Sequence, residues 1–217
     1  PESNARIMFK KPVKVAATNP LGGKDAKKLR AEILKRFNVS ETQLDSFFGL
    51  KDNIKVLKLS EPSDRTLVYS NGDEPYFFDA TGRGDVYPSI YATWKCPTML
   101  PVLPIQAPVS KFVIGGADFF LPGVAVGVEG GLLTLEDMPD FERGSLMLIV
   151  CIGNPMPIAV GEMFLSKSEA IQAGMKGKGM RVAHTYRDSL WELGSSSAPA
   201  GFLPAPLDTG AWVTPSD

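Results

Sequence analysis

The chain has 217 residues, a formal net charge of −1 and 44% hydrophobic residues, which is typical of a globular protein with one or two domains. Its longest apolar run, residues 146–152, is too short to span a bilayer, and no charged-then-apolar secretory signal opens the chain. Cys96 and Cys151 stand apart and outside any CxxC pair, which predicts reduced core thiols rather than a disulfide or metal ligands. These features favour a cytoplasmic protein.

Positive charge is concentrated near the N-terminus. Residues 8–37 contain nine Lys or Arg against two acids, whereas residues 109–194 contain seven Lys or Arg against ten acids. A basic face of this kind favours a polyanionic partner, because phosphate contacts release counterions. The alternative is a solvated helix surface that only keeps the domain soluble.

The first elements in chain order are a strand and two helices. Residues 1–7 show no pattern, and the family resemblance given below implies that Met8 is the natural start and that residues 1–7 are a processing remnant. Residues 10–16 alternate loosely and predict a strand. Residues 25–37 predict an amphipathic helix, because apolar residues recur every four positions. Its core positions are Leu29, Ile33 and Phe37, and its surface positions are Lys27, Lys28, Arg30 and Lys35.

A capping box at residues 40–43 predicts a second, short helix that buries Leu44, Phe47 and Phe48. Three strands follow, at residues 54–59, 66–69 and 76–78, with turn residues between them. Pro88 suits the first turn of a helix that carries Ile90, Tyr91 and Trp94 towards the core. The first domain is therefore predicted to be α+β, a sandwich of helices on an antiparallel sheet, ending in a proline-rich exit near residue 105.

The second half predicts several short strands and glycine-rich turns. Residues 112–114 are expected to form a strand, and Phe119-Phe120 to plug a core, although these rings could also stack on bases. Strands are expected at 145–152, 158–164 and 180–184, with a helix at 167–173 capped by Ser166 and Glu169. This pattern favours a small barrel. Residues 195–217, rich in Ser, Ala, Pro and Gly, predict a flexible linker.

The motifs of catalysis and cofactor binding are not found. The single histidine, His184, has no nucleophile at a suitable spacing, and there is no Gly-x-Ser-x-Gly elbow. Gly22-Gly23-Lys24 lacks the first glycine and the hydroxyl residue of a phosphate-binding loop. The acids of residues 136–142 match no calcium loop. We therefore predict no catalytic residue, no metal and no cofactor, and we expect His184 to be a hydrogen-bonded barrel residue.

One basic cluster is interleaved with glycines: Lys176, Lys178, Arg181, His184 and Arg187. The glycines remove side chains that would keep a phosphodiester backbone at a distance, and an arginine can hold a phosphate bidentately. Strand alternation places Arg181 and His184 on opposite faces, so the cluster cannot face one ligand as a whole. The alternative is a basic surface turn.

Four segments carry a resemblance to a known family: residues 8–12, 87–94, 110–124 and 184–191. Residues 110–124 resemble the opening of a PUA domain, a pseudo-β-barrel that binds structured RNA. Together the segments resemble the N-terminal half of the ligatin family (eukaryotic translation initiation factor 2D), whose smaller relatives are the malignant T-cell amplified sequence proteins. The resemblance implies an α+β pre-PUA domain over residues 8–104, a PUA domain over 105–194, and a linker over 195–217 towards further C-terminal domains.

The resemblance also implies a function. It implies a non-catalytic translation factor that docks on the small ribosomal subunit and its rRNA, supporting GTP-independent placement of tRNA in the P site and post-termination recycling. Initiator or deacylated tRNA and the chain's own C-terminal SUI1 and winged-helix domains are the further partners, and no membrane is expected. The implied RNA-binding residues are Lys10, Lys11, Lys111, Gly115, Gly116, Asp118, Lys176, Lys178 and Arg181.

Two other functions remain open. One is an RNA-binding appendage of a tRNA- or rRNA-modifying enzyme. Two features argue against it: residues 1–105 contain no catalytic carboxylate motif, and the domain they form is too small for the catalytic core of such an enzyme. The other is a module whose apolar or acidic surface recruits a protein partner.

Overall fold

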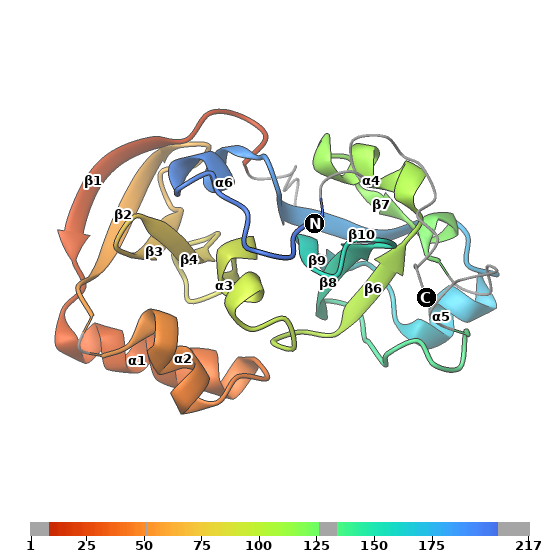
Figure 1. Cartoon of the computed structure of the whole chain (residues 1–217), viewed down its shortest axis with the longest axis horizontal. Helices are drawn as coiled ribbons and strands as arrows, with labels where there is room; N and C mark the ends of the chain where they lie inside the picture. The colour runs from red at the N-terminus through yellow and green to blue at the C-terminus, as the bar shows by residue number, and fades with distance from the viewer. Residues whose placement is uncertain (1–8, 51, 126–133, 204–217) are drawn as a thin grey trace. The chain divides into compact units, whose positions relative to one another are not determined.

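The computed structural model describes residues 9–50, 52–125 and 134–203, and within them it resolves two compact units (Figure 1). The first unit consists of residues 9–100 and 187–197, and the second of residues 101–186 and 198–203. The chain thus leaves the first unit after Leu100 and returns to it at Arg187. Residues 187–194, which the sequence places with the second domain, group with the first.

The sheet of the first unit has five antiparallel strands in chain order, β1-β2-β3-β4-β5. Each strand pairs with the next along the chain, because short turns join β2 to β3 and β3 to β4. The four expected strands are found, although the first begins four residues later than predicted, and β5 was not predicted. The bounds are β1 Lys14–Pro20, β2 Ile54–Glu61, β3 Leu67–Asn71, β4 Glu74–Asp79 and β5 Val86–Pro88.

Helices α1 (Gly23–Arg36) and α2 (Glu41–Phe48) cover one face of this sheet (Figure 1). Phe77 of β4 packs against Phe37 and Phe48, with ring centroids 6.4 and 5.1 Å away. Phe78 points to the opposite face, as strand alternation requires, and its ring lies 5.1 Å from that of Phe9. Leu29, Ile33 and Phe37 are buried, as their helical spacing predicts.

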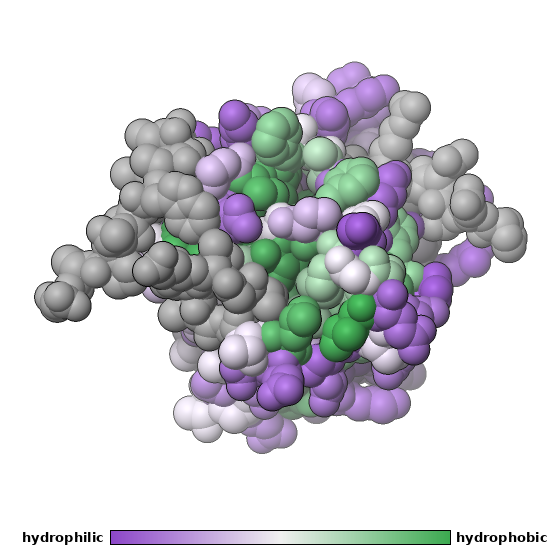
Figure 2. Space-filling model, turned by 90° about the vertical axis from the view of Figure 1, so that its right-hand side faces the viewer, coloured by the Kyte–Doolittle hydropathy of each residue, from purple (hydrophilic) through white to green (hydrophobic). Residues whose placement is uncertain are grey.

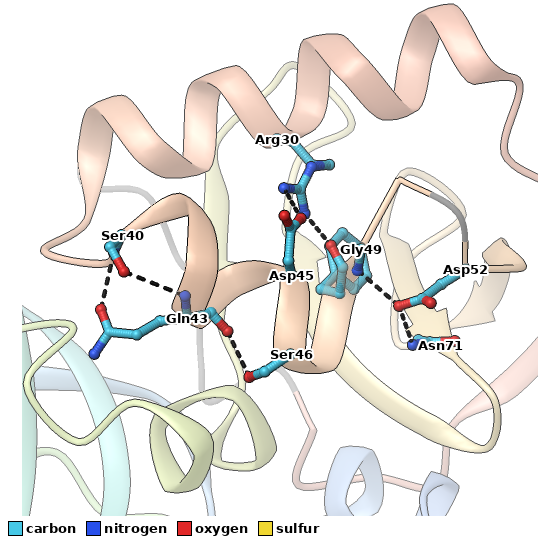
Figure 3. A network of polar contacts seen from close by, with 9 residues as sticks. Arg30, Ser40, Gln43, Asp45, Ser46, Gly49, Asp52 and Asn71 are labelled. Carbon is cyan, nitrogen blue, oxygen red and sulfur yellow. Dashed lines mark hydrogen bonds and ion pairs between the residues drawn. The ribbon is translucent and has the colours of Figure 1, made fainter.

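Arg30 corrects the predicted surface of α1, because its side chain is buried rather than exposed. Its guanidinium donates to the backbone carbonyl of Phe48, at the end of α2, and to the carboxylate of Asp45 (Figure 3). A carbonyl at a helix end has no intrahelical donor, so Arg30 supplies one. Lys27, Lys28 and Lys35 are exposed, as predicted.

Serine side chains cap the starts of two helices in the first unit. The predicted capping box of α2 is confirmed: Ser40 Oγ accepts from the backbone of Gln43, whose side chain accepts from the backbone of Ser40 (Figure 3). Pro88 differs from its prediction, because it ends strand β5 and does not lie in a helix. Ser89 instead caps α3 (Ile90–Lys95) by accepting from the backbone of Ala92.

A short C-terminal helix, α6 (Ser189–Leu193), completes the first unit. Its first backbone N–H donates to the carbonyl of Phe9 at 3.0 Å. The hydroxyl of Tyr91 donates to the carbonyl of Trp191 at 2.6 Å and accepts from the N–H of Ser196 at 3.0 Å. Burial raises the pKa of Tyr91 to about 12, so the hydroxyl stays neutral and keeps both bonds.

The second unit contains a five-stranded sheet in the order β6-β8-β9-β10-β7. Strand β6 runs parallel to β8, and the other pairs are antiparallel. Its strands carry the core of the unit, which includes the fully buried Leu103, Ile149, Val160, Met180 and Val182. The bounds are β6 Val102–Ile105, β7 Phe119–Phe120, β8 Leu146–Cys151, β9 Pro157–Met163 and β10 Lys178–Thr185.

Backbone hydrogen bonds join the two edges of this sheet. A 3-10 turn, η1 (Leu121–Gly123), follows β7 and leads the chain back to β6. There Ala125 N–H donates to Pro104 O at 2.9 Å, and Ile105 pairs with Val124 in an antiparallel bridge. The sheet therefore curls until its edges meet, which gives the small barrel that the sequence predicts.

Residues 112–114 do not form the predicted strand. They are the last turn of a helix, α4 (Ala107–Ile114), whose buried positions Ala107, Ser110 and Val113 recur every three residues. Pro108 lies in its first turn, where a missing N–H is tolerated. In the sequence, Pro108 is the last proline of the proline-rich exit from the first domain, and this spacing of prolines does not indicate a helix.

The remaining expectations for this unit have mixed outcomes. The capping box of α5 (Lys167–Gln172) is confirmed, with Ser166 and Glu169 as its two members. The predicted core plug is half right, because Phe119 is buried whereas Phe120 is 49% exposed. The predicted linker is described only as far as residue 203; its Phe202 is buried, with its ring 4.6 Å from that of Tyr186.

Both cysteines are free and buried, one in each unit. Burial raises the pKa of the Cys151 thiol to about 11, so that it stays protonated at neutral pH. His184 is fully buried within β10. No helix among the described residues has the length and apolar character needed to cross a membrane.

Candidate nucleic-acid interface

The first unit presents cations along one helix. Lys24, Lys28 and Lys35 of α1 are exposed, and their spacing of four and seven residues places them on one stripe of the helix. The opposite stripe of α1 faces the core through Leu29 and Ile33. Burial of one stripe therefore orients the lysines to solvent, where they can meet a polyanion.

Lys10 and Lys11, both predicted to bind RNA, are exposed just before β1. The buried ring of Phe9 anchors the chain immediately before them. Lys14, farther along, is 2.6 Å from Glu61 on the neighbouring strand, and this lysine lowers the pKa of the Glu61 carboxyl. The ion pair partly neutralises Lys14 and distinguishes it from Lys10 and Lys11.

The second unit brings two distant turns together. Strand β7 pairs antiparallel with β10, and Phe120 lies opposite Lys178. The turn after α4 (residues 115–118) thereby comes beside the turn after α5 (residues 174–178), and Lys178 Nζ lies 2.9 Å from Asp118 Oδ2. We call these two turns the β7–β10 surface. The sequence predicts both turns as RNA-facing, and the structure shows that they adjoin.

Gly115 and Gly116 end helix α4. The N–H of Gly115 donates to Lys111 O at 2.9 Å, and Gly116 has φ of +85°, a left-handed conformation that favours glycine. A Cβ on Gly115 would lie 3.0 Å from Lys111 O. The turn itself therefore favours glycine at 116, and a side chain at 115 would crowd Lys111 O, whatever else approaches the turn.

The turn after α5 is also held by backbone geometry. Gly174, Met175 and Gly177 all have positive φ, and Met175 N–H donates back to Ala170 O at 2.9 Å. On the other side Gly177 O accepts from the backbone N–H of Leu121 at 2.9 Å. Lys176 lies between these fixed points and is exposed. A fixed backbone that presents a lysine reduces the conformational entropy lost on binding an anion.

Arg181 has a different environment from that of Lys176. It lies opposite Glu162 in the β9–β10 register, and its guanidinium is 2.5 Å from Glu162 Oε2. Both side chains are less than one-third exposed. A phosphate at Arg181 would therefore have to compete with this carboxylate, unlike one at Lys176.

Two exposed aromatic residues flank the turn at residues 115–118 and are absent from the predicted site. Phe112 is 59% exposed on α4, and Lys111 Nζ lies 5.2 Å from the centroid of its ring. Phe120 is exposed opposite Lys178. A helical reading of residues 107–114 would have identified Phe112, because the buried positions 107, 110 and 113 leave 112 facing outward.

The described parts of the chain contain no group of three or more His, Cys, Asp and Glu side chains placed to hold a metal ion. Among the acids expected in the loop at residues 136–142, Asp140 pairs with Lys167 at 3.1 Å. The same ammonium group donates to the carbonyl of Met138 at 2.5 Å, so it fixes this loop to α5.

Two family models match the chain. A Pre-PUA-like domain matches residues 9–97, and the model described as "elF2D, PUA domain" matches residues 100–189. Eukaryotic translation initiation factor 2D of Rattus norvegicus is 35% identical to this chain, over 93% of this chain and 34% of the relative. The same factor of Homo sapiens is 32% identical, over 93% of this chain and 33% of the relative. The chain thus spans about one-third of the length of these relatives.

A shorter relative is similar over most of its own length. Translation machinery-associated protein 20 of Saccharomyces cerevisiae is 26% identical over 75% of this chain and 84% of the relative. Two archaeal structures share the fold. A hypothetical protein of Pyrococcus horikoshii has a TM-score of 0.62 and 22% identity, over 82% of this chain and 100% of that chain. A PUA domain of Aeropyrum pernix has a TM-score of 0.62 and 17% identity, over 86% of this chain and 100% of that chain. These likenesses confirm the α+β class and the PUA barrel. The chain is a translation-related PUA protein, and over residues 9–189 it belongs to the translation initiation factor 2D family, of which it carries the Pre-PUA-like and PUA domains.

Proposed function

We propose that this chain binds RNA and, through it, docks on the small ribosomal subunit. The observation that carries the proposal is the pairing of β7 with β10, which joins two turns into one surface with exposed Lys176 and Lys178. The matched relatives are translation initiation factors, which makes ribosomal RNA the natural polyanion.

The exposed lysines of the first unit supply a second electrostatic contribution. Lys10, Lys11 and the stripe on α1 would contact phosphates without reading sequence. Arg181 is a weaker contact in this proposal, because Glu162 already holds its guanidinium. Gly115 and Gly116 act by shaping the turn, and Asp118 competes with the RNA for Lys178 through its exposed ion pair.

The finer function rests on the family relation. In a complete protein this part would anchor the factor while further domains support GTP-independent placement of initiator tRNA in the P site and the removal of deacylated tRNA after termination. The anchor performs no catalysis in this proposal and acts in the cytoplasm, where ribosomes are found.

The direct test is binding of the chain to purified small ribosomal subunits across a salt titration, with large subunits as the control. We expect selective binding that weakens steeply as salt rises, because each phosphate contact releases counterions. Lys176→Gln with Lys178→Gln should lower affinity about tenfold and reduce the salt slope by about two.

The matched control removes two exposed lysines of the first unit, Lys58→Gln and Lys95→Gln, which lie outside the α1 stripe. It should bind within about twofold of the wild type, because these positions are not in the proposed contact. Absence of selective binding at low salt would contradict the anchor. Equal losses in the two double variants would assign the effect to net charge and remove the β7–β10 surface from the proposal.

A further inference from the structure

Exposed phenylalanine is rare in this chain and confined to one segment. All twelve phenylalanines lie in the described residues, and only Phe112 and Phe120 are exposed, at 59% and 49%. Both lie in the nine residues that end α4 and form β7, on either side of the glycine turn. Apolar side chains lie among hydrophilic ones on the face of the second unit shown in Figure 2.

Packing does not explain the exposure of these rings. Val113 and Phe119, next to them in sequence, are each 1% exposed and fill the core of the unit. The helix period sends Phe112 outward and strand alternation sends Phe120 outward, so each ring points away from the core that its neighbour fills. The apolar area left in water by the two rings is available to a ligand.

Each ring also has a lysine beside it. Lys111 Nζ lies 5.2 Å from the Phe112 centroid, and Lys178 lies opposite Phe120 in the strand register. An unpaired nucleotide has the two groups that such a pair accommodates, a base with a flat π-face and a phosphate with negative charge. A protein partner with an apolar surface would match the rings but would give no anion to Lys111, and only an anionic ligand can compete with Asp118 for Lys178.

We infer that Phe112 and Phe120 stack on unpaired RNA bases whose phosphates Lys111 and Lys178 hold. This inference rests on the proposed function, and it specifies single-stranded or looped RNA as the ligand of the β7–β10 surface. A regular duplex keeps its bases stacked inside the helix and offers these rings only a phosphate backbone.

The test compares the full 217-residue chain with its Phe112→Leu and Phe120→Leu variants. The probes are a fluorescent single-stranded RNA 12-mer, the same strand with abasic sites in place of its bases, and a 12-base-pair RNA duplex. We expect each substitution to weaken binding of the single strand at least about fivefold, the scale of losing one stacked base. The abasic strand and the duplex should bind wild type and variants alike.

Two further variants separate stacking from folding and from general apolar loss. Phe120→Trp should retain or improve binding, since it preserves a stacking face, and Leu50→Ala, which removes another half-exposed apolar side chain in the first unit, should leave it unchanged. The salt slope should remain that of the wild type in both leucine variants, because no charge is lost.

The outcomes distinguish the two proposals. If the wild type binds RNA with a steep salt slope and the leucine variants bind the single strand equally well, stacking is wrong and the RNA anchor stands. If the wild type binds none of the RNA probes, both proposals fail. If the leucine variants lose binding to small subunits and keep full affinity for the single strand, the rings contact protein and the inference is overturned.

Discussion

The two units each contain a five-stranded sheet, yet they build their cationic surfaces in opposite ways. In the first unit every strand pairs with its neighbour in the chain, and a stripe of exposed lysines lies along the single helix α1. In the second unit the sheet joins β7 to β10, and the ion pair of the β7–β10 surface, Lys178–Asp118, links residues 60 positions apart. One surface is thus a local property of a helix, whereas the other exists only while a long-range strand pairing holds.

The largest effect is expected in the second sheet, where β9 approaches β10 most closely. A Cβ on Gly161 of β9 would lie 2.5 Å from the backbone oxygen of Arg181 on β10, and a backbone atom cannot rotate away. We expect Gly161→Ala to destabilise the second unit by about 3 kcal/mol. Gly23→Ala is the matched control in the first unit, since its Cβ would meet nothing within 4 Å.

The readout uses the cysteines, because each unit buries one of them. Alkylation in a urea series, quantified for each cysteine by peptide mass spectrometry, reports opening of the first unit through Cys96 and of the second through Cys151. For Gly161→Ala the midpoint of Cys151 should fall much further than that of Cys96. An equal fall at both cysteines would contradict the expected confinement to the second unit.

The reciprocal perturbation is Arg30→Met in the first unit. It removes the donor to Phe48 O and leaves that carbonyl unsatisfied at the end of α2, at an expected cost of about 2 kcal/mol. The urea midpoint of Cys96 alkylation should fall. The exposed substitution Lys27→Ala on the same helix should change the free energy of unfolding of the first unit by less than about 0.5 kcal/mol. If Arg30→Met leaves the free energy of unfolding unchanged, the buried guanidinium contributes no net stability.

The two capping boxes allow a balanced comparison, since each unit has one. Ser40→Ala should destabilise the first unit and Ser166→Ala the second, each by about 1 kcal/mol, because each deletes an acceptor for a backbone N–H of the first helical turn. Ser40→Ala should lower the urea midpoint of Cys96 alkylation, and Ser166→Ala that of Cys151. Thr42→Ala, an exposed change in α2, is the control and should be nearly neutral; a loss matching that of Ser40→Ala would exclude capping as the cause.

The smallest expected effect concerns Asp118. Neutralising it by Asp118→Asn frees Lys178 from its ion pair, so single-stranded RNA should bind about twofold to threefold more tightly. Asp64→Asn removes the same charge from an exposed position of the first unit and should change affinity less. Weaker binding by Asp118→Asn would mean that Asp118 positions Lys178 for the RNA instead of competing with it.

Local signals in the sequence predicted the parts of the fold that local physics decides. Both capping boxes, the core stripe of α1 and the strands of the first sheet are present as expected. Errors arose where a distant residue decides the outcome: Arg30 is buried because Phe48 O needs a donor, and residues 112–114 are helical because α4 packs into the barrel. The two turns of the candidate site were predicted separately, and only the β7–β10 pairing, which no local pattern encodes, places them side by side.

Residues 101–186 of the second unit separate the two parts of the first unit in the chain, which returns to the first unit at Arg187. During synthesis the first unit cannot acquire α6 until residues 101–186 have been translated, so the two hydrogen-bond partners of Tyr91 are made about a hundred residues after it. A nascent chain that ends within residues 101–186 would therefore carry a first unit without α6 and without either hydrogen bond of the Tyr91 hydroxyl.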